Sequence, residues 1–75
     1  MTDEQAATLV AAGRLLQSKQ WPYGRKRIEK LSGESYPQAV ARVIRALPED
    51  ERAYLRELVI WVRDYERQEA MLEKA

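Results

Sequence analysis

"SYPQAVARVIRALPEDERAYLRELVIWV", residues 35–62, decides the fold of this 75-residue chain. Ser35 and Gln38 have the spacing of a capping box, and Pro37 falls in the first turn, where a missing N–H is harmless. A helix is therefore predicted to begin here, with an apolar stripe at helical spacing: Val40, Val43, Ile44 and Leu47. Pro48 ends this helix and opens the next, because a first turn accepts proline and a helix interior does not.

The helix that opens at Pro48 is predicted to be the longest, running to about Leu72. Three carboxylates, residues 49–51, occupy its first turn, where the helix dipole favours negative charge. Its predicted apolar stripe is Tyr54, Leu55, Leu58, Val59, Trp61, Val62 and Tyr65. The pattern thins after Tyr65, so the core is expected within about residues 3–65 and residues 66–75 are expected to be an extended or frayed helix end.

The amino-terminal part of the chain predicts another helix. Thr2 and Gln5 have capping-box spacing, and the helix should end near Gln20, because a proline at position 22 disfavours helical geometry just before it. Gly13 costs this helix about 1 kcal/mol relative to alanine. That cost indicates that another helix packs closely at this glycine.

A short further helix is expected from about residue 24 to residue 32, with Gly33 as its left-handed stop. The prediction is therefore a single all-α domain over residues 1–75. It would be a small four-helix domain with a long C-terminal helix and a helix-turn-helix-like core over residues 25–47.

Composition excludes several classes of function. The chain has neither cysteine nor histidine, which removes disulfides, the commonest zinc ligands and the commonest general base. We therefore expect no metal, no cofactor and no enzymatic activity. No apolar run approaches the roughly 20 residues of a membrane-spanning helix, and the acidic start is wrong for a signal peptide. A soluble cytoplasmic protein without a membrane partner is expected, in the host cytoplasm if a phage encodes it.

Positive charge is concentrated in the first half of the chain. Residues 5–33 carry a local net charge of +5, although the whole chain carries only +1. The basic residues there are candidates for binding nucleic acid or an acidic protein surface: Arg14, Lys19, Arg25, Lys26, Arg27 and Lys30. Trp21 and Tyr23 stand beside them. Aromatic and basic residues together are typical of single-strand binding, but a core this small also needs its large aromatics, so both interpretations stay open.

Two further sets of residues are candidate contacts. If residues 25–47 form a helix-turn-helix, the second helix would read bases with Gln38, Arg42 and Arg45. The fit is incomplete, because Glu29 stands where the common motif has a small residue. The long helix carries groups that a small core does not reach, which suggests docking into a partner groove or against a second copy: Ile60, Arg63, Arg67, Met71 and Leu72. The alternative is a monomer with a frayed tail.

Residues 39–60, "AVARVIRALPEDERAYLRELVI", resemble the helix, Leu-Pro, helix segment of sigma-factor region 4 and of phage antitermination proteins of the Q type. The matching positions are Val40, Ile44, Leu47, Pro48, Glu49, Arg52, Leu55 and Leu58. In those families the Leu-rich helix usually leads into a DNA-reading helix-turn-helix, which this sequence does not show after residue 60. The resemblance therefore implies a reduced, phage-type regulator that contacts host RNA polymerase.

Three hypotheses of function follow. The first is a non-enzymatic transcription regulator that binds host RNA polymerase, with nucleic acid near the basic region, and blocks or modulates transcription factors or termination. The second is a dimeric helix-turn-helix DNA-binding protein. The third is a small protein-interaction inhibitor with no nucleic-acid role.

Overall fold

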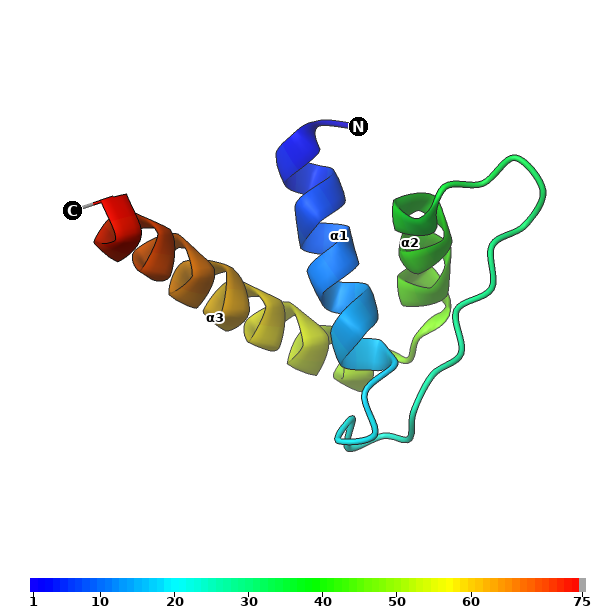
Figure 1. The fold of residues 1–75 in the computed structure, drawn as a ribbon. Helices are drawn as coiled ribbons and strands as arrows, with labels where there is room; N and C mark the ends of the chain where they lie inside the picture. The colour runs from blue at the N-terminus through cyan, green and yellow to red at the C-terminus, as the bar shows by residue number, and fades with distance from the viewer. Residues whose placement is uncertain (75) are drawn as a thin grey trace.

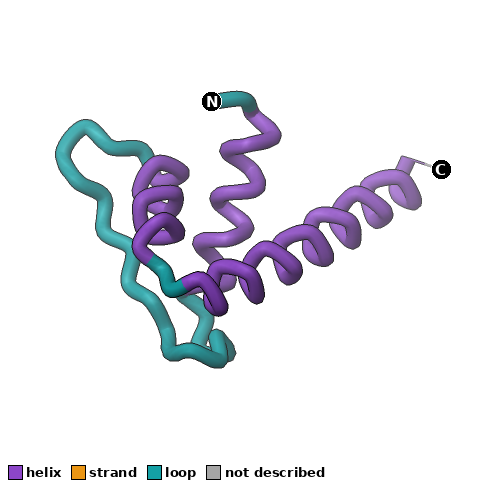
Figure 2. The backbone as a smooth tube through the Cα atoms, turned by 180° about the vertical axis from the view of Figure 1, so that it is seen from behind, coloured by secondary structure: helices purple, strands orange, loops and turns teal. Residues whose placement is uncertain are grey.

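The computed structural model consists of three α-helices within the described part of the chain: α1 (Asp3–Leu16), α2 (Tyr36–Ala46) and α3 (Glu49–Lys74). It describes the backbone of residues 1–74 and the side chains of residues 1–71. Helix α1 packs against both α2 and α3, and lies between them (Figure 1). Helices α1 and α3 diverge like the arms of a V. A long loop, residues 17–35, passes the end of α1 and returns along the outer side of α2 (Figure 2).

The capping boxes predicted for α1 and α2 are both present. The Gln5 N–H donates to Thr2 Oγ1 at 3.1 Å, and the Thr2 N–H donates to Gln5 Oε1 at 3.0 Å. In the same way, the Gln38 N–H donates to Ser35 Oγ at 3.3 Å, and the Ser35 N–H donates to Gln38 Oε1 at 2.9 Å. Each pair satisfies backbone donors that a helix start leaves without partners inside the helix. These local signals explain why both helix starts are readable from the sequence.

The prediction of a helix over residues 24–32 is wrong, so the domain has three described helices and not four. Gly24 and Gly33 have φ of 96° and 77°, in the left-handed region that glycine tolerates best. Between them only Ile28 packs against the core, whereas Leu31 is 57 % exposed. A single partly buried apolar residue cannot stabilise so short a helix, because isolated short helices are marginal in water.

Helix α1 ends earlier than expected, at Leu16 and not near Gln20. The chain turns after Gln17, and the N–H of Lys26 then donates to the carbonyl of Leu16 at 2.8 Å. The early end lets Trp21 fold back against α1. Its side chain is 4 % exposed, so Trp21 belongs to the core, whereas Tyr23 is 42 % exposed.

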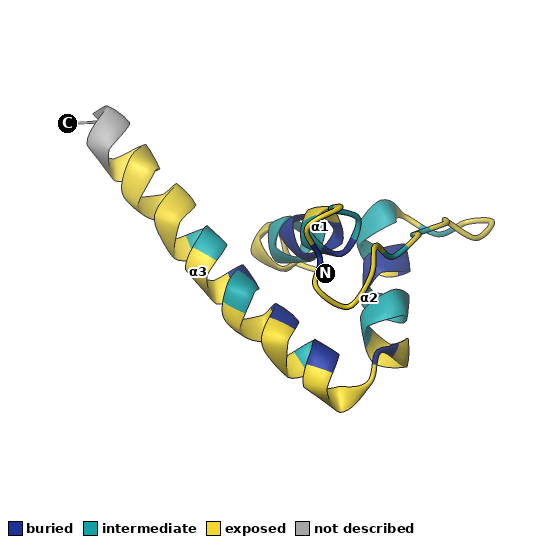
Figure 3. Ribbon diagram, turned by 90° about the horizontal axis from the view of Figure 1, so that it is seen from below, coloured by how far each residue is buried: buried dark blue, intermediate teal, exposed yellow. Residues whose placement is uncertain are grey.

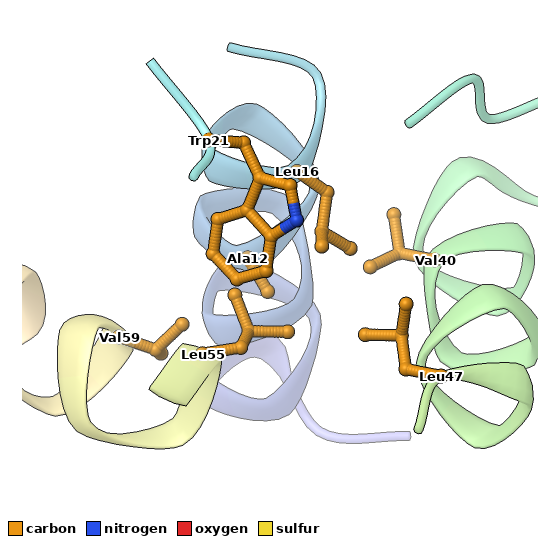
Figure 4. Packing of buried hydrophobic residues seen from close by; sticks show 7 residues of the cluster. All are labelled: Ala12, Leu16, Trp21, Val40, Leu47, Leu55 and Val59. Atoms are coloured by element: carbon orange, nitrogen blue, oxygen red, sulfur yellow. The ribbon is translucent and has the colours of Figure 1, made fainter. Parts of the chain in front are cut away.

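The core is built from all three helices and from Trp21. Figure 4 shows its seven side chains directed toward one another: Ala12, Leu16, Trp21, Val40, Leu47, Leu55 and Val59. Gly13 is buried where α2 crosses α1, as the sequence indicated. A Cβ placed on Gly13 would lie 2.5 Å from Tyr36 Oη and 2.8 Å from Val40 Cγ2. The glycine therefore permits the close approach of the two helices.

Helix α3 extends well beyond this core. Its amino-terminal half contributes Leu55 and Val59 to the core, while residues 64–71 are exposed (Figure 3). Trp61 and Tyr65 were expected in the core-facing stripe, but they are 77 % and 57 % exposed. None of the described helices is long and apolar enough to cross a membrane.

Candidate interaction surfaces

The six basic residues predicted to meet a polyanion fall into two groups. Among the described side chains, Arg14, Lys19, Arg25 and Lys30 have no carboxylate within ion-pair distance, and all four are exposed. Arg27 Nε lies 2.8 Å from Glu29 Oε1 in a pair that is open to solvent. Such a pair is weak and exchanges readily with another anion.

Lys26 differs from its neighbours because it is partly buried and pairs with a buried carboxylate. Its Nζ lies 3.2 Å from Oε1 of Glu51, within ion-pair distance but without hydrogen-bond geometry. The side chains are 29 % and 9 % exposed. Glu51 stands in the first turn of α3, where the helix dipole also favours a carboxylate. Lys26 therefore neutralises a buried charge and ties the loop to α3, and it is the least available of the six for a ligand.

The loop cations surround a hollow at the end of α1. It has a volume of about 410 Å³ and is lined by Gln17, Arg25, Lys26, Arg27 and Ile28. We call residues 25–30 the basic loop. The exposed guanidinium groups of Arg25 and Arg27 can donate to phosphate or carboxylate oxygens, and the rigid, planar fork of each group matches such anions.

The predicted base-reading residues are not presented together. Arg42 donates from Nε to Glu34 Oε2 at 3.1 Å and from Nη2 to the carbonyl of Glu29 at 2.7 Å. Gln38 and Arg45 are exposed, but the Gln38 amide oxygen is used in the capping box. The helix that would precede the recognition helix is absent, because residues 25–34 form loop. The helix-turn-helix over residues 25–47 is therefore not formed.

The Arg42 pair fixes the loop to α2. The hydrogen bond from Arg42, aided by the Leu31 backbone N–H, lowers the pKa of Glu34 below its ordinary value of 4.5. The same hydrogen bond raises the pKa of Arg42. Both groups are accordingly charged at neutral pH, and the guanidinium of Arg42 is occupied by the protein itself.

The predicted partner contacts on α3 are largely exposed. Ile60 and Met71 are 55 % and 68 % exposed. Arg67 Nη2 lies 3.4 Å from Oε1 of Glu4 on α1. Arg63 Nη1 lies 3.2 Å from Oε2 of Glu66 on α3 itself. The side chain of Leu72 lies outside the described residues.

Three aromatic residues connect the loop to α3. The ring centroids of Trp21, Tyr23 and Tyr54 lie 5.5–5.6 Å apart, in tilted or edge-to-face arrangements. Tyr54 continues on α3 into Leu58, Trp61 and Tyr65, at alternating spacings of four and three residues. We call these four residues of α3 the aromatic face. Tyr54 is 41 % exposed and Leu58 is partly buried, so the face becomes more open toward Trp61.

From the sequence, Tyr54, Trp61 and Tyr65 all belong to the apolar stripe of α3, and Trp61 and Tyr65 are also among the groups that a small core does not reach, but none of the three is predicted as a contact residue. The signal was present, because the predicted stripe of seven residues is too wide for one core-facing side. Residues 55, 59 and 62 follow one line on the helix, and residues 54, 58, 61 and 65 follow another. The small core covers Leu55, Val59 and part of Leu58, and it leaves Trp61 and Tyr65 exposed.

An apolar depression lies between α1 and α3. It has a volume of about 270 Å³, and Leu9, Ala12, Leu55, Val59 and Ile60 are among its lining residues. Arg52 and Arg56 stand at its edge. Among the described residues no cluster of three or more carboxylate, histidine or cysteine side chains is arranged to hold a metal ion.

Neither protein-family models, nor curated proteins, nor solved structures gave a match to this chain. Function is therefore inferred from the geometry of the surfaces described above.

Proposed function

We propose that this protein is a non-enzymatic regulator of transcription, of the phage type, that acts by binding host RNA polymerase. The observation that carries the proposal is the exposed, largely aromatic outer side of α3, which projects past the core. Trp61 is 77 % exposed, whereas Trp21, the other tryptophan, is buried in the core. A small monomer gains nothing from exposing such a residue, whereas tryptophan and tyrosine are the residues that most often anchor protein interfaces.

The link to transcription comes from the joint between α2 and α3. Helix α2 ends at Ala46, Leu47 is buried, and α3 begins immediately after Pro48. The proposal takes this joint together with the resemblance of residues 39–60 to the helix, Leu-Pro, helix segment of sigma region 4 and of Q-type antitermination proteins. The carboxyl side of the joint is α3 itself, so the segment that resembles polymerase-binding proteins leads directly into the aromatic face.

The basic loop supplies a second contact in this proposal. Arg25, Arg27 and Lys30 are exposed and would lie near RNA, DNA or an acidic polymerase surface. Tyr23 touches Tyr54, so the loop and the aromatic face adjoin at the start of α3. One partner could therefore cover both surfaces.

In this proposal the protein regulates transcription by occupying a surface of the polymerase. It blocks the site of a competing factor, or it stabilises one state of the polymerase through a higher affinity for that state. No chemical step is required, and the absence of histidine and cysteine from the sequence is compatible with this mode of action.

The proposal is tested by capture from host lysate on the immobilised protein, with and without nuclease. Polymerase subunits should be retained in both conditions by the wild type and lost with Trp61→Ala/Tyr65→Ala. A matched triple variant, Arg25→Glu/Arg27→Glu/Lys30→Glu, should lose only the nuclease-sensitive fraction. Retention of nucleic acid alone, or of polymerase by the aromatic variant at wild-type levels, would contradict the proposal.

A protein-interaction inhibitor without a nucleic-acid role is the second candidate. One observation favours it: Lys26, one of the six candidate cations, is paired with the buried Glu51. In this case the loop variant would weaken a single protein complex, and nuclease would change nothing.

A further inference from the structure

Within residues 49–71, helix α3 carries its arginines on one side, and the opposite side carries carboxylates without any arginine or lysine. With about 100° between successive residues, the half of the helix centred on Trp61 contains no lysine or arginine between residues 49 and 71. Its exposed carboxylates are Asp50, Glu57, Asp64 and Glu69. The arginines occupy the other half, at spacings of four, seven and four residues: Arg52, Arg56, Arg63 and Arg67. Within α3, the aromatic face is therefore bordered by negative charge alone, and the basic loop adjoins the face only at its Tyr54 end.

The contacts of the described residues agree with this division. Arg67 pairs with Glu4 of α1, and Arg52 and Arg56 line the depression between α1 and α3. The arginine side is thus turned toward α1. The aromatic side bears a separate hollow of about 270 Å³, lined by Trp61, Asp64, Tyr65 and Gln68.

The hollow combines two groups that attract a cation. The faces of Trp61 and Tyr65 carry the negative part of the aromatic quadrupole, and Asp64 adds a full negative charge beside them. The Glu69 carboxylate interacts with the Tyr65 hydroxyl and raises its pKa. An arginine or lysine side chain can lay its apolar stem on the rings and place its charge at the carboxylate.

The same border disfavours two other occupants. Exposed aromatic rings alone would suit stacked bases, but the phosphates of a nucleic acid would meet Glu57 and Asp64. A second copy packed through the same side would bring like carboxylates of the two α3 helices together, because a two-fold interface repeats the same patch. Both arrangements would place negative charges against the carboxylates of α3, whereas a cationic partner would place positive charges there.

We propose that the aromatic face docks a basic amphipathic helix of a partner protein. The alternating spacing of four and three residues along Tyr54, Leu58, Trp61 and Tyr65 is the seam by which two helices pack side by side. Apolar residues of the partner would pack on Trp61 and Tyr65, and its lysines or arginines would pair with Glu57, Asp64 and Glu69. The inference rests on the proposed function only in taking α3 as the surface that contacts a protein. It goes further by stating that the partner segment is a basic amphipathic helix.

The test uses purified full-length protein and dye-labelled synthetic helices, with binding followed by fluorescence anisotropy. The probe is a Leu/Lys peptide with leucines at heptad spacing. A Leu/Glu peptide with the same apolar seam and a scrambled Leu/Lys peptide are the controls. The Leu/Lys helix should bind at least tenfold more tightly than either control, and Trp61→Ala/Tyr65→Ala should abolish the preference.

Charge variants separate the acidic border from general electrostatic attraction. Glu57→Gln/Asp64→Asn should weaken Leu/Lys binding about three- to tenfold, since each exposed pair contributes a modest part of the affinity. Glu29→Gln/Glu66→Gln changes the net charge equally, away from the aromatic face, and should leave the affinity within about twofold. Helical circular dichroism of each variant verifies folding.

Equal affinity for the Leu/Lys and Leu/Glu helices would overturn the inference. So would equal losses in the two charge variants, dimerisation of the protein through the aromatic face, or protection of Trp61 by an oligonucleotide. If the Leu/Lys helix binds as expected but polymerase is not captured from lysate, the inference stands and the proposed function fails. The two proposals are therefore tested separately.

Discussion

Lys26 Nζ lies 3.2 Å from Oε1 of Glu51, and this pair joins the loop to the first turn of α3 at the edge of the core. The carboxylate is 9 % exposed. A buried charge without its partner is costly, so one cation of the basic loop has a structural task. The remaining cations of the loop are left to meet a ligand.

Removing the lysine alone should destabilise the protein more than removing the lysine together with the charge that it neutralises. Lys26→Ala leaves Glu51 buried without a partner and should cost about 1–3 kcal/mol of unfolding free energy. Lys26→Ala/Glu51→Gln should recover part of that loss, because no uncompensated charge remains. Urea unfolding at neutral pH measures both. Arg27→Ala, which removes an exposed pair, is the control and should change stability by less than about 0.5 kcal/mol; an equal loss there would refute the distinction.

Gly13→Ala should destabilise the domain although alanine is the better helix former. The added methyl would lie 2.5 Å from Tyr36 Oη and 2.8 Å from Val40 Cγ2, and overpacking of this kind costs about 1–3 kcal/mol. That exceeds the gain in helix propensity of about 1 kcal/mol. Thermal unfolding measures the difference. Tyr36→Phe should reduce the penalty in the double variant, and an unchanged or higher Tm for Gly13→Ala alone would contradict the packing.

The two tryptophans should differ in stability and in fluorescence. Trp21→Ala should cost about 3–5 kcal/mol, enough to unfold so small a domain, because its side chain is 4 % exposed. Trp61→Ala should change stability by no more than about 0.5 kcal/mol. In Trp61→Phe the remaining emission should be blue-shifted and resist iodide quenching. Strong quenching of that emission would place Trp21 outside the core.

Stability should depend on pH through Glu34. Its pKa is lowered in the folded protein, first by the hydrogen bond from Arg42. A carboxyl group with a lowered folded pKa contributes stability above its unfolded pKa and loses it as the pH falls through the folded value. Glu34→Gln should therefore be less stable than the wild type at pH 7, and the difference should shrink as the pH falls below about 4.5. Chemical unfolding across this range measures it, and a constant difference would exclude the linkage.

Local signals in the sequence predicted the helix starts well. The exchanges between Thr2 and Gln5 and between Ser35 and Gln38 depend on residues three positions apart, so no tertiary information is needed. Gly13 likewise indicated a close helix before the structure showed α2 there. The all-α class and the long final helix follow from the same kind of pattern.

The predictions were wrong where contacts between residues far apart in the sequence determine the local structure or the burial of a side chain. Residues 24–32 have helical spacing at Ile28 and Leu31, but the loop gains more from the Lys26 and Arg42 contacts, which join residues 13 to 25 positions apart. The Arg42 contact also removes a residue that the sequence offered for base reading. Trp61 and Tyr65 belong to the apolar pattern of α3, and only the small size of the core leaves them outside it.

The most direct measurement is ¹⁹F NMR of the protein labelled with 5-fluorotryptophan and titrated with the Leu/Lys helix. Trp61→Phe assigns the two signals. The Trp61 signal should shift progressively to saturation while the Trp21 signal stays in place, because contact occurs on the outer side of α3. A Trp61 signal that is unchanged at saturating peptide, or that responds equally to the Leu/Glu helix, would contradict the assignment of this face as the contact surface.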